Sequence, residues 1–577
     1  MKIRRNRTTA GIGALVVAIA AGVFLVASTA NAKQAALPRA ETLYMTGNQW
    51  GPYNDLNPIK NWDYVTGVVG LVYETPFRYD PFKDKLLPWL ATGGAWKSKN
   101  TYVLTARQGV KWSDGKPVTA ADFKFSYDLI KIATHPQHTL WTTSGLKSTK
   151  VAGNTVTFTF RGTPNYQQWD NYLFNVPVVP QHIWKSYSPE TVTSGNMADP
   201  KKLIGTGPFV YQSGLGDATQ TFVWKKRSGW WATAALGLDI KPKYIVDIHN
   251  GSNPASLANL QAGNIDISNN FAPKSALGGK ITTYFNGAPY HLGANTTWLF
   301  PNTQKKPLDD KEFRRALAYS VNMGQILDKA YQNLVNKANP TGLLPIWNKW
   351  IDKKVVKQHG FSYNAAKAKS ILAAAGYKDA DGDGYVENKD GSKITLNIIC
   401  PNGWTDWMTA IQIISESAKA VGINVTPAYP EYATLADDRG HARFDLLLGN
   451  DRQFSNTPWT YYEYIFRLPI LDNQTTVNYE RYTNQTAWTL TQQLDKTPTS
   501  NVKAQQAIHS KLQTIFLQEM PAIPLWYNGG WAMMSTKYWT NWPSSKGAGL
   551  QNTPITWRNY WQMTSIDMLT HLKPAGQ

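Results

Sequence analysis

The spacing of apolar residues changes along the chain and divides it into two regions. Up to about residue 180, short segments of alternating apolar and polar residues are separated by turn residues. Residues 155–160 alternate most clearly and follow an Ala-Gly-Asn turn, which predicts one arm of a β-hairpin. From about residue 300, segments with helical spacing alternate with strand-like segments. The first region therefore predicts short strands, and the second predicts an α/β arrangement.

The stretch GVKWSDGKPVTAADFKFSYDLIK, residues 109–131, predicts a tight polar turn followed by a helix. Thr119 and Asp122 have the spacing of a capping box at the start of that helix. Phe123 and Tyr127 then begin an apolar stripe at helical spacing. No catalytic motif has this shape, so we expect the segment to be structural.

Two helices are predicted early in the second region from their start and stop residues. Asp309 is placed to cap a helix that carries Phe313 and Leu317 on one face. Asn364 is placed to start another helix, which Gly376 ends. Their apolar faces require a sheet or other helices to pack against.

Further along, the order of elements predicts a parallel βαβ unit. Residues 394–399 read as a strand, about 407–421 as a helix that Gly422 stops, and 423–425 as the next strand. A strand, loop, helix and strand in this order imply two parallel strands. The loop 401–407 then lies at the carboxyl end of a parallel strand, where open α/β sheets bind ligands.

That loop reads PNGWTDW and offers two aromatic faces, a carboxylate and an amide. Trp404 lies between glycine and threonine, which is not a typical core setting. Trp407 has two interpretations, because it could equally be the first apolar residue of the following helix.

The N-terminus predicts export from the cytoplasm. Lys2, Arg4, Arg5 and Arg7 precede a largely apolar run, and an Ala-Asn-Ala cleavage site ends a signal peptide of residues 1–32. An uncleaved membrane anchor remains the alternative, because the apolar run approaches membrane-spanning length. We expect a protein of the cell envelope or cell surface, either periplasmic or extracellular.

Cysteine content and charge narrow the functional classes. Cys400 is the only cysteine, so the exported chain must fold without an internal disulfide. The net charge of +20 becomes +16 once the four basic residues of the signal segment are removed. The basic residues are scattered rather than clustered, which argues against nucleic-acid binding and favours a solvated basic surface.

Aromatic residues are unusually frequent, with 24 Trp and 29 Tyr in 577 residues. Many of the tryptophans lie beside Gly, Asn, Asp or Pro, in NQWG, GWTDW, NTPWTYY, YNGGW and WTNWP. Aromatic side chains in polar loops are typical of flat binding surfaces with one wet edge. We therefore expect several of them to contact a ligand.

An acidic loop at residues 379–390 has the spacing of a calcium site. The oxygen ligands at the expected positions would come from Asp379, Asp381, Asp383, Tyr385 and Asp390. Asp390 replaces the usual bidentate Glu, and no helix is predicted after the loop. The alternative is a solvated Asp-Gly turn without metal, and any calcium would have a structural role.

Several segments together resemble the family 5 extracellular solute-binding proteins of ABC importers, the oligopeptide- and dipeptide-binding group. They include GVKWSDGKPVTAADFKFSYD at 109–128, YETPFRYD at 73–80, LPWLA at 87–91, VPVVPQHIW at 176–184, LIGTGPFVY at 203–211, PLDDKEFRRALAYSVN at 307–322, AGYKDADGDGYVE at 375–387 and MPAIPLWY at 520–527. The resemblance implies an α/β, two-lobed periplasmic-binding-protein type II fold with an extra α+β domain inserted in the first lobe. It implies a monomer that binds a ligand without catalysis and delivers it to ABC permease subunits in the membrane.

The same resemblance divides the mature chain between two lobes. Lobe I would comprise 33–75, 201–296 and a C-terminal return at 527–577, with the extra domain at 76–200 and lobe II at 297–526. The hinge would lie near 294–300 and 521–528, where Trp298 and Trp526 would flank the cleft. Ligand would favour closure because only the closed form contacts it from both lobes.

Ligands within this family include peptides, nickel complexes and sugars. Peptide binders resemble one another in a segment whose acid, just before a proline, anchors the peptide amino group. The matching position here is Thr457, although Asp451 could substitute. The nine histidines show no pairing suited to nickel.

Other segments resemble the branch that binds β-glucans and cellobiose. They are GWTDW at 403–407, IDISNNFAP at 265–273, ANTTWLFPNT at 294–303, TPWTYY at 457–462 and the terminal YWQMTSIDMLTHLKP. Aromatic planes would bury the flat faces of a β-linked oligosaccharide, and amides and carboxylates would bind its hydroxyls. The expected ligand-binding residues are Trp404, Asp406, Trp407, Asn269, Asn270, Asn450, Trp459, Tyr461, Trp298 and Trp526.

A peptide-binding protein of the same family is the first alternative to an oligosaccharide-binding protein. A secreted glycoside hydrolase is the alternative from another class, and no paired-carboxylate motif for it is recognisable. No cofactor is expected apart from the calcium discussed above.

Overall fold

The structure is a computed structural model that describes residues 37–46, 55–60, 65–80, 85–195, 197, 199, 202–212, 221–283, 290–451, 457–545, 563 and 565–576. The signal segment expected at 1–32 lies outside these residues. So do residues 560–562 and 564 of the terminal motif YWQMTSIDMLTHLKP. Within them, no helix combines the length and apolarity needed to cross a bilayer.

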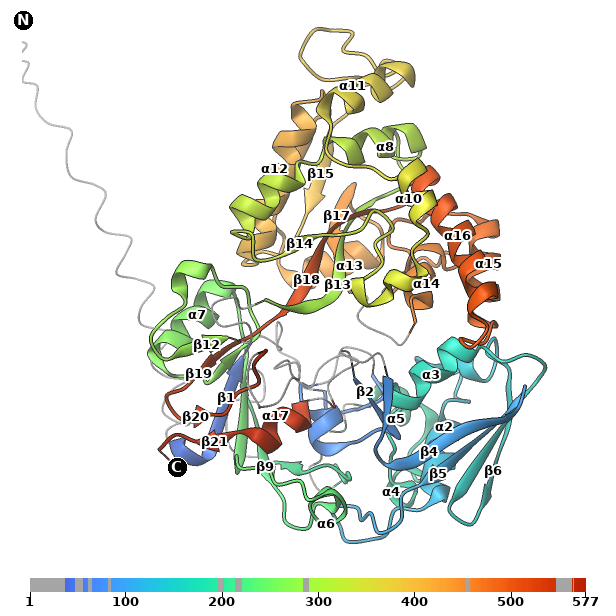
Figure 1. The fold of residues 1–577 in the computed structure, drawn as a ribbon, viewed down its shortest axis with the longest axis vertical. Coiled ribbons are helices and arrows are strands. Elements are labelled where there is room, and N and C mark those ends of the chain that lie inside the picture. The colour runs from blue at the N-terminus through green and yellow to red at the C-terminus, as the bar shows by residue number, and fades with distance from the viewer. Residues whose placement is uncertain are drawn as a thin grey trace, which may run out of the picture.

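Two large mixed sheets form the centres of two lobes, which lie one above the other in Figure 1. The lower sheet has seven strands in the order β12-β19-β11-β1-β10-β9-β8. These are β1 (Thr42–Thr46), β8 (Phe209–Tyr211), β9 (Thr221–Lys226), β10 (Tyr244–Ile248), β11 (Ile267–Ser268), β12 (Ile281–Thr283) and β19 (Met533–Ser535). Strands β10 and β11 pair in parallel with β1. Strand β9 pairs antiparallel with β10, and β19 pairs antiparallel with β11.

The upper sheet has six strands in the order β14-β18-β13-β17-β15-β16. These are β13 (Tyr290–Pro301), β14 (Asn336–Lys337), β15 (Leu396–Ile399), β16 (Val425–Ala428), β17 (Leu446–Gly449) and β18 (Ile523–Trp531). Helix α12 (Thr405–Lys419) connects β15 to its parallel partner β16. The predicted βαβ unit is therefore confirmed, with its helix starting two residues earlier than expected.

A smaller sheet forms the extra domain at the lower right of Figure 1. Its strand order is β4-β5-β7-β6, from β4 (Ala91–Ser98), β5 (Thr101–Ala106), β6 (Leu146–Ala152) and β7 (Thr155–Phe160). The hairpin of β6 and β7 confirms the arm predicted at 155–160. The small pairs β2 (Phe77–Asp80) with β3 (Lys85–Pro88), and β20 (Trp539–Thr540) with β21 (Lys573–Pro574), complete the strands.

Helices cover these sheets. In the extra domain and lower lobe they are α2 (Ala120–Leu129), α3 (Tyr166–Asn175), α4 (Gln181–Trp184), α5 (Pro189–Ser194), α6 (Trp231–Leu236), α7 (Asn253–Ala262) and α17 (Ser565–His571). In the upper lobe they are α8 (Lys311–Ser320), α9 (Met323–Gln325), α10 (Lys353–His359), α11 (Ala365–Ala374), α12, α13 (Tyr432–Gly440), α14 (Trp459–Phe466), α15 (Gln485–Asp495) and α16 (Val502–Glu519).

Local sequence signals explain several helix starts. The capping box of Thr119 and Asp122 is present at the start of α2, and the Asn364 side chain caps α11. The cap of α8 differs from the prediction: Asp310, not Asp309, accepts a hydrogen bond from the amide of Glu312. Adjacent aspartates cannot be told apart from sequence, because either suits an N-cap.

Strands β13 and β18 are the long antiparallel pair that passes from the lower lobe to the upper lobe (Figure 1). Their pairing shifts register between Gly293 and Asn295 and again between Thr297 and Trp298. Such irregularities interrupt a ladder and let a strand pair bend. They lie within or beside the hinge segments expected at 294–300 and 521–528, and their role as a hinge stays a prediction.

The extra domain is joined to the lower lobe around the carboxylate of Glu74, which is fully buried. This carboxylate accepts hydrogen bonds from the indole Nε1 of Trp89 at 2.9 Å, Trp231 at 2.8 Å and Trp230 at 3.4 Å. Burial raises the pKa of Glu74, and the indole donors oppose that rise. Three tryptophans from two sequence regions are thus fixed by one side chain.

Candidate functional site

The loop between β15 and α12 is placed where one lobe touches the other. Gly403 adopts φ +78°, and a Cβ there would lie 3.1 Å from the carbonyl oxygen of Gly251 in the lower lobe. The Gly403 carbonyl also accepts a hydrogen bond from the amide of Asn253 at 3.2 Å. Glycine therefore allows the loop both its turn and its close approach to the opposite lobe.

Trp404 is half-buried at the N-cap position of α12. Its ring stacks on that of Tyr432, with centroids 6.1 Å apart and planes at 18°, and meets the edge of Trp407 at 4.8 Å. Its partner Tyr432 is also half-buried. Neighbouring rings hold the indole in one orientation while part of its surface stays accessible.

A polar network crosses from lobe to lobe beside this loop. The Asn253 side chain donates to the Asp406 carboxylate at 3.1 Å, and the Asn270 side chain donates to the side-chain Oδ1 of Asn253 at 3.5 Å. Asp406 is buried, and burial raises its pKa to about 6, opposed by backbone amides, by the nearby hydroxyl of Tyr331 and by the hydrogen bond from Asn253. The structure thus brings together two predicted residues, Asp406 and Asn270, through a third that was not predicted.

Asn269 and Asn450 lie apart from this network, and each takes part in a hydrogen bond between a side chain and a backbone carbonyl oxygen. The Asn269 side chain is half-buried and donates to the carbonyl oxygen of Trp531 at 2.6 Å. The Asn450 carbonyl oxygen accepts from the side chain of Asn295 at 2.5 Å. The partners in these two bonds, Trp531 and Asn295, belong to β18 and β13, the strands that connect the lobes.

Most of the predicted aromatic residues are packed inside the protein. Trp298 contacts Tyr461 edge-on at 5.9 Å, and Tyr461 meets Trp347 at 4.9 Å. Trp526 packs against Tyr331 at 5.1 Å. The residues with at most 4% of their surface exposed are Trp298, Trp407, Trp459, Tyr461 and Trp526.

This packing corrects the expectation that tryptophans in polar loops form open binding faces. The tryptophans of NTPWTYY, YNGGW and WTNWP, which are Trp459, Trp531, Trp539 and Trp542, are all buried. In the described structure the indoles fill space between elements, because a large ring can bury its face while polar neighbours stay at the surface. Trp404 is the one predicted ring that remains half-exposed.

The sequence-based prediction missed Asn253 and Tyr331. Asn253 opens α7 after β10, a strand parallel to β1, so it also follows the carboxyl end of a parallel strand. The same reasoning that selected residues 401–407 could have found it. No sequence signal distinguishes Tyr331 from the other tyrosines.

The acid considered as a substitute anchor for peptides already has a partner. The Asp451 carboxylate forms an ion pair with Arg439 at 2.6 Å, and that guanidinium lies over the ring of Tyr479. Thr457, at the position of the acid in peptide binders, is buried. A ligand amino group at Asp451 would have to compete with a guanidinium.

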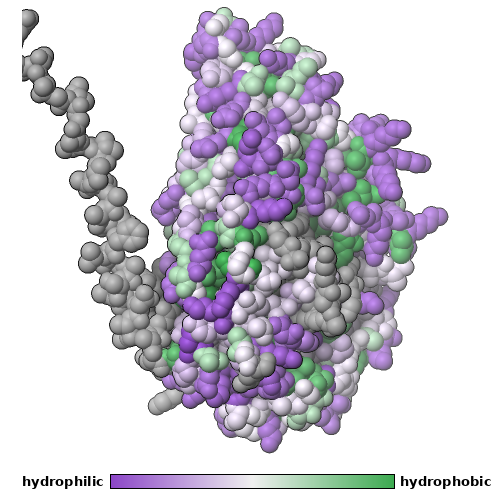
Figure 2. All heavy atoms as spheres, turned by 60° about the vertical axis from the view of Figure 1, so that its left-hand side comes forward, coloured by the Kyte–Doolittle hydropathy of each residue, from purple (hydrophilic) through white to green (hydrophobic). Residues whose placement is uncertain are grey.

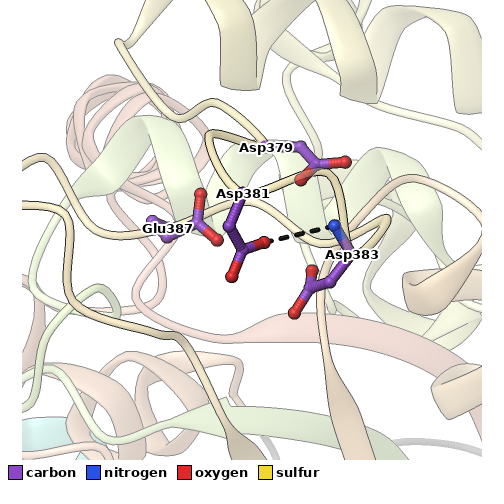
Figure 3. A group of neighbouring side chains, drawn as sticks. All are labelled: Asp379, Asp381, Asp383 and Glu387. Carbon is purple, nitrogen blue, oxygen red and sulfur yellow. Dashed lines mark hydrogen bonds between the residues drawn. The ribbon is translucent and has the colours of Figure 1, made fainter.

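The acidic loop gathers a carboxylate group different from the predicted one (Figure 3). Ligand atoms of Asp379, Asp381, Asp383 and Glu387 all lie within 4.8 Å of one another. Asp390 instead accepts hydrogen bonds from Ser392 at 2.6 Å and Lys306 at 3.4 Å. Glu387 therefore joins the three aspartates in the position that was predicted for Asp390. The backbone amide of Tyr385 donates to Asp383 at 2.9 Å.

Lys393 occupies one side of this carboxylate group. Its ammonium lies 2.7 Å from Asp381 and 2.8 Å from Asp383, and these acids raise its pKa. A lysine ammonium can neutralise an acidic loop without metal. Calcium binding here stays a prediction, with this lysine as its internal competitor.

If calcium binds this loop, adding calcium to metal-free protein should raise the melting temperature, because a ligand of the folded state stabilises it. Asp379→Asn should remove the shift, whereas Asp390→Asn should keep it. Calorimetric melting with calcium and with magnesium would measure this, and no shift in the unaltered protein would reject the site.

Comparisons with known proteins agree on one family. The bacterial extracellular solute-binding proteins, family 5, match residues 85–470. Oligopeptide-binding protein AppA of Bacillus subtilis is 26% identical over 351 residues, covering 60% of this chain and 61% of AppA. The periplasmic murein peptide-binding protein MppA of Escherichia coli is 24% identical over 472 residues, covering 78% of this chain and 81% of MppA. The chain thus covers less than two thirds of AppA.

Solved structures are similar to this chain over nearly their whole length. The periplasmic oligopeptide-binding protein of an oligopeptide ABC transporter from Thermotoga maritima, with mannohexaose bound, has a TM-score of 0.86 and 38% identity. The match covers 94% of this chain and 100% of that one. AppA of Bacillus subtilis in complex with a nonapeptide has a TM-score of 0.74 at 20% identity, covering 92% of this chain and 99% of that one, which shows the shared fold alone.

Proposed function

Because the chain belongs to the bacterial extracellular solute-binding proteins of family 5, we propose that it captures an oligosaccharide outside the membrane. It then delivers this ligand to the permease subunits of an ABC importer. The protein acts as a monomer and performs no chemistry on the ligand. This role fits the export that the N-terminal sequence predicts.

One observation carries the choice of ligand. The Thermotoga maritima protein is 38% identical over its whole length and, although it is named for oligopeptides, it holds mannohexaose. The named peptide-binding relatives are more distant, at 26% identity for AppA and 24% for MppA. Specificity follows the site rather than the fold, so the less distant protein is the better guide.

The side chains at the lobe contact suit an uncharged, hydroxyl-rich ligand. Trp404 and Tyr432 offer adjacent stacked rings, and Asn270, Asn253 and Asp406 offer amide and carboxylate groups close by. Sugar rings present apolar C–H faces with hydroxyls at their edges, which such a mixture of groups can bind. Asp451 is neutralised by Arg439, which disfavours capture of a peptide amino group.

An oligopeptide is the second candidate ligand. The names of AppA, the OppA proteins of Lactococcus lactis and MppA all refer to peptides, and these proteins belong to the same family. A peptide would not need Asp451 if its amino group were bound by Asp406, whose carboxylate is buried between the lobes. The two candidates thus predict different partners for the same cleft.

Binding couples to transport through closure of the two lobes. The contacts of Gly403 and Asp406 with Asn253 join the lobes in this structure, and β13 and β18 connect them. A ligand held from both sides stabilises this closed arrangement over an open one. The permease then recognises the surface that closure creates.

Calorimetric titration of the mature protein, residues 33–577, tests the ligand class. We expect binding of soluble mannose- or glucose-based β-linked oligosaccharides of about two to six units, because sugar sites of this kind pair stacking with hydroxyl contacts. Peptides of two to nine residues serve as the opposing panel. Binding of peptides with no response to any sugar would reject the proposal in favour of the second candidate.

A further inference from the structure

The N-terminus of α3 in the extra domain meets the C-terminus of α15 in the upper lobe. The backbone amide of Gln168 donates to the Asp495 carboxylate at 2.9 Å. The side chain of Gln167 donates to the carbonyl oxygen of Leu494 at 2.8 Å and to the side chain of Gln505 at 3.2 Å. Gln167, Asp495 and Gln505 have at most 1% of their surface exposed.

Each helix therefore caps the other. The first amides of a helix and its last carbonyls have no partner within it. The N-cap residue of α3, Asn165, makes no side-chain cap of its own, and the Asp495 carboxylate accepts from the third residue of the helix. In return, Gln167 binds a carbonyl in the last turn of α15.

This contact joins the extra domain to the upper lobe, in addition to the hinge strands and the contacts of Gly403 and Asp406 with Asn253 that join the two lobes. The extra domain is fixed to the lower lobe through Glu74, and the backbone of Ser113 donates to Gly205 at 2.9 Å. Helix α3 therefore moves with the lower lobe. Figure 1 shows α3 beneath α15 at the right, on the opposite side from the crossing of β13 and β18. A contact far from a hinge restricts the angle between the two hinged bodies more strongly than a contact close to it.

We propose that the reciprocal caps between α3 and α15 form a closure latch, in which Gln167 and Asp495 hold the extra domain against the upper lobe. The latch rests on the proposed two-lobe function only in requiring that the lobes open and close. It makes the extra domain a part of the closing machinery and not only a scaffold. Opening exposes the buried Asp495 and Gln167 and leaves both helix ends without these partners.

The environment of Asp495 adds a dependence on pH. Its pKa is raised to about 8, mainly by burial and also by the nearby Glu463 of α14, although hydrogen bonds from Gln168, Gln167 and Asn165 oppose the rise. Glu463 is itself paired with Arg467, and Tyr172 of α3 is the titratable group on the other side. The facing residue from α16 is the uncharged Gln505.

The sign of this dependence follows from where the proton resides. In the closed form Asp495 keeps its proton up to a pKa of about 8, whereas an exposed aspartate in the open form loses it near 4. Closure therefore takes up a proton between these values, and the latch is strongest at low pH and is lost as pH rises through 8. From pH 6 to pH 9 the ratio of closed to open protein should fall by about tenfold or more.

Small-angle X-ray scattering of the ligand-free protein at pH 6 and pH 9 tests the latch. We expect the unaltered protein to be compact at pH 6 and expanded at pH 9. Asp495→Asn keeps the shape and an acceptor without the charge, so it should stay compact at both values. Asp495→Ala and Gln167→Ala should both be expanded at pH 6, and circular dichroism checks that each variant is folded.

Gln492→Ala is the matched control, because Gln492 is exposed on the same helix. It should behave as the unaltered protein does. Equal radii for the unaltered protein, Asp495→Asn and Gln167→Ala at both pH values would overturn the latch. Since no ligand is present, this result is independent of whether the sugar panel succeeds or fails.

Discussion

Replacing Glu74 by alanine should lower the free energy of unfolding by about 3–5 kcal/mol, because buried donors without partners are costly. The carboxylate has no exposed surface and binds the indoles of Trp89, Trp230 and Trp231. Its removal leaves these N–H groups without an acceptor and opens a cavity where the extra domain joins the lower lobe. Denaturant unfolding of the ligand-free protein measures the loss.

Two further variants identify the cause of that loss. Glu74→Gln keeps the volume and one acceptor oxygen, so it should lie between the alanine variant and the unaltered protein. Glu416→Ala removes an exposed glutamate from α12 and should change the stability little. A Glu74→Ala loss no larger than that of Glu416→Ala would mean that the three indoles do not depend on the carboxylate.

Replacing Trp404 by alanine should weaken oligosaccharide binding by about 1–3 kcal/mol, the range for a stacking aromatic at an interface. The indole is half-buried and is supported by Tyr432 and Trp407, so a ligand would find it already oriented. The melting temperature should change little, because the Trp404 ring is only partly buried and its exposed part does not stabilise the core. Calorimetry with the tightest ligand of the panel gives the affinity.

Tyr363→Ala provides the comparison, because Tyr363 is an aromatic residue with 45% of its surface exposed near α11. It should alter neither affinity nor melting. A large drop in melting temperature with unchanged affinity for Trp404→Ala would assign Trp404 to the core with Trp407.

The backbone elements were predictable where local signals are strong. The capping box of Thr119 and Asp122, the hairpin at 155–160 and the βαβ unit around α12 each follow from short-range chemistry. The choice between Asp309 and Asp310 as a cap failed for the opposite reason. Both residues satisfy the same local rule, and only tertiary geometry separates them.

The side-chain positions of the candidate site were less predictable. Trp459 was expected at a surface because it lies in a polar loop, and Trp298 and Trp526 were expected beside the cleft, yet all three are buried. Local composition reports the neighbours along the chain and not the neighbours in space, which decide burial. The acidic loop shows the same limit, since its turn brings Glu387 rather than Asp390 to the three aspartates.

Contacts between the lobes were beyond any local signal. Gln167 and Leu494 are 327 positions apart, and Asn253 and Asp406 are 153 apart. Neither pair belongs to a motif, and each depends on how two folded bodies meet. The position of Asn253 after a parallel strand was predictable, but the structure was needed to find the two pairings, because glutamine and asparagine at helix ends are common in any protein. Figure 2 shows that hydrophilic residues predominate on one face of the molecule. The hydropathy of that face does not by itself identify a binding site.

The most direct test of the central claim is small-angle X-ray scattering of the mature protein at pH 8.5, titrated with mannohexaose and with a tripeptide. High pH weakens the proposed latch, so the ligand-free protein starts open. We predict that saturating sugar reduces the radius of gyration and that the tripeptide leaves it unchanged. Contraction with the tripeptide alone, or calorimetrically confirmed sugar binding without contraction, would contradict capture of an oligosaccharide by closure of the two lobes.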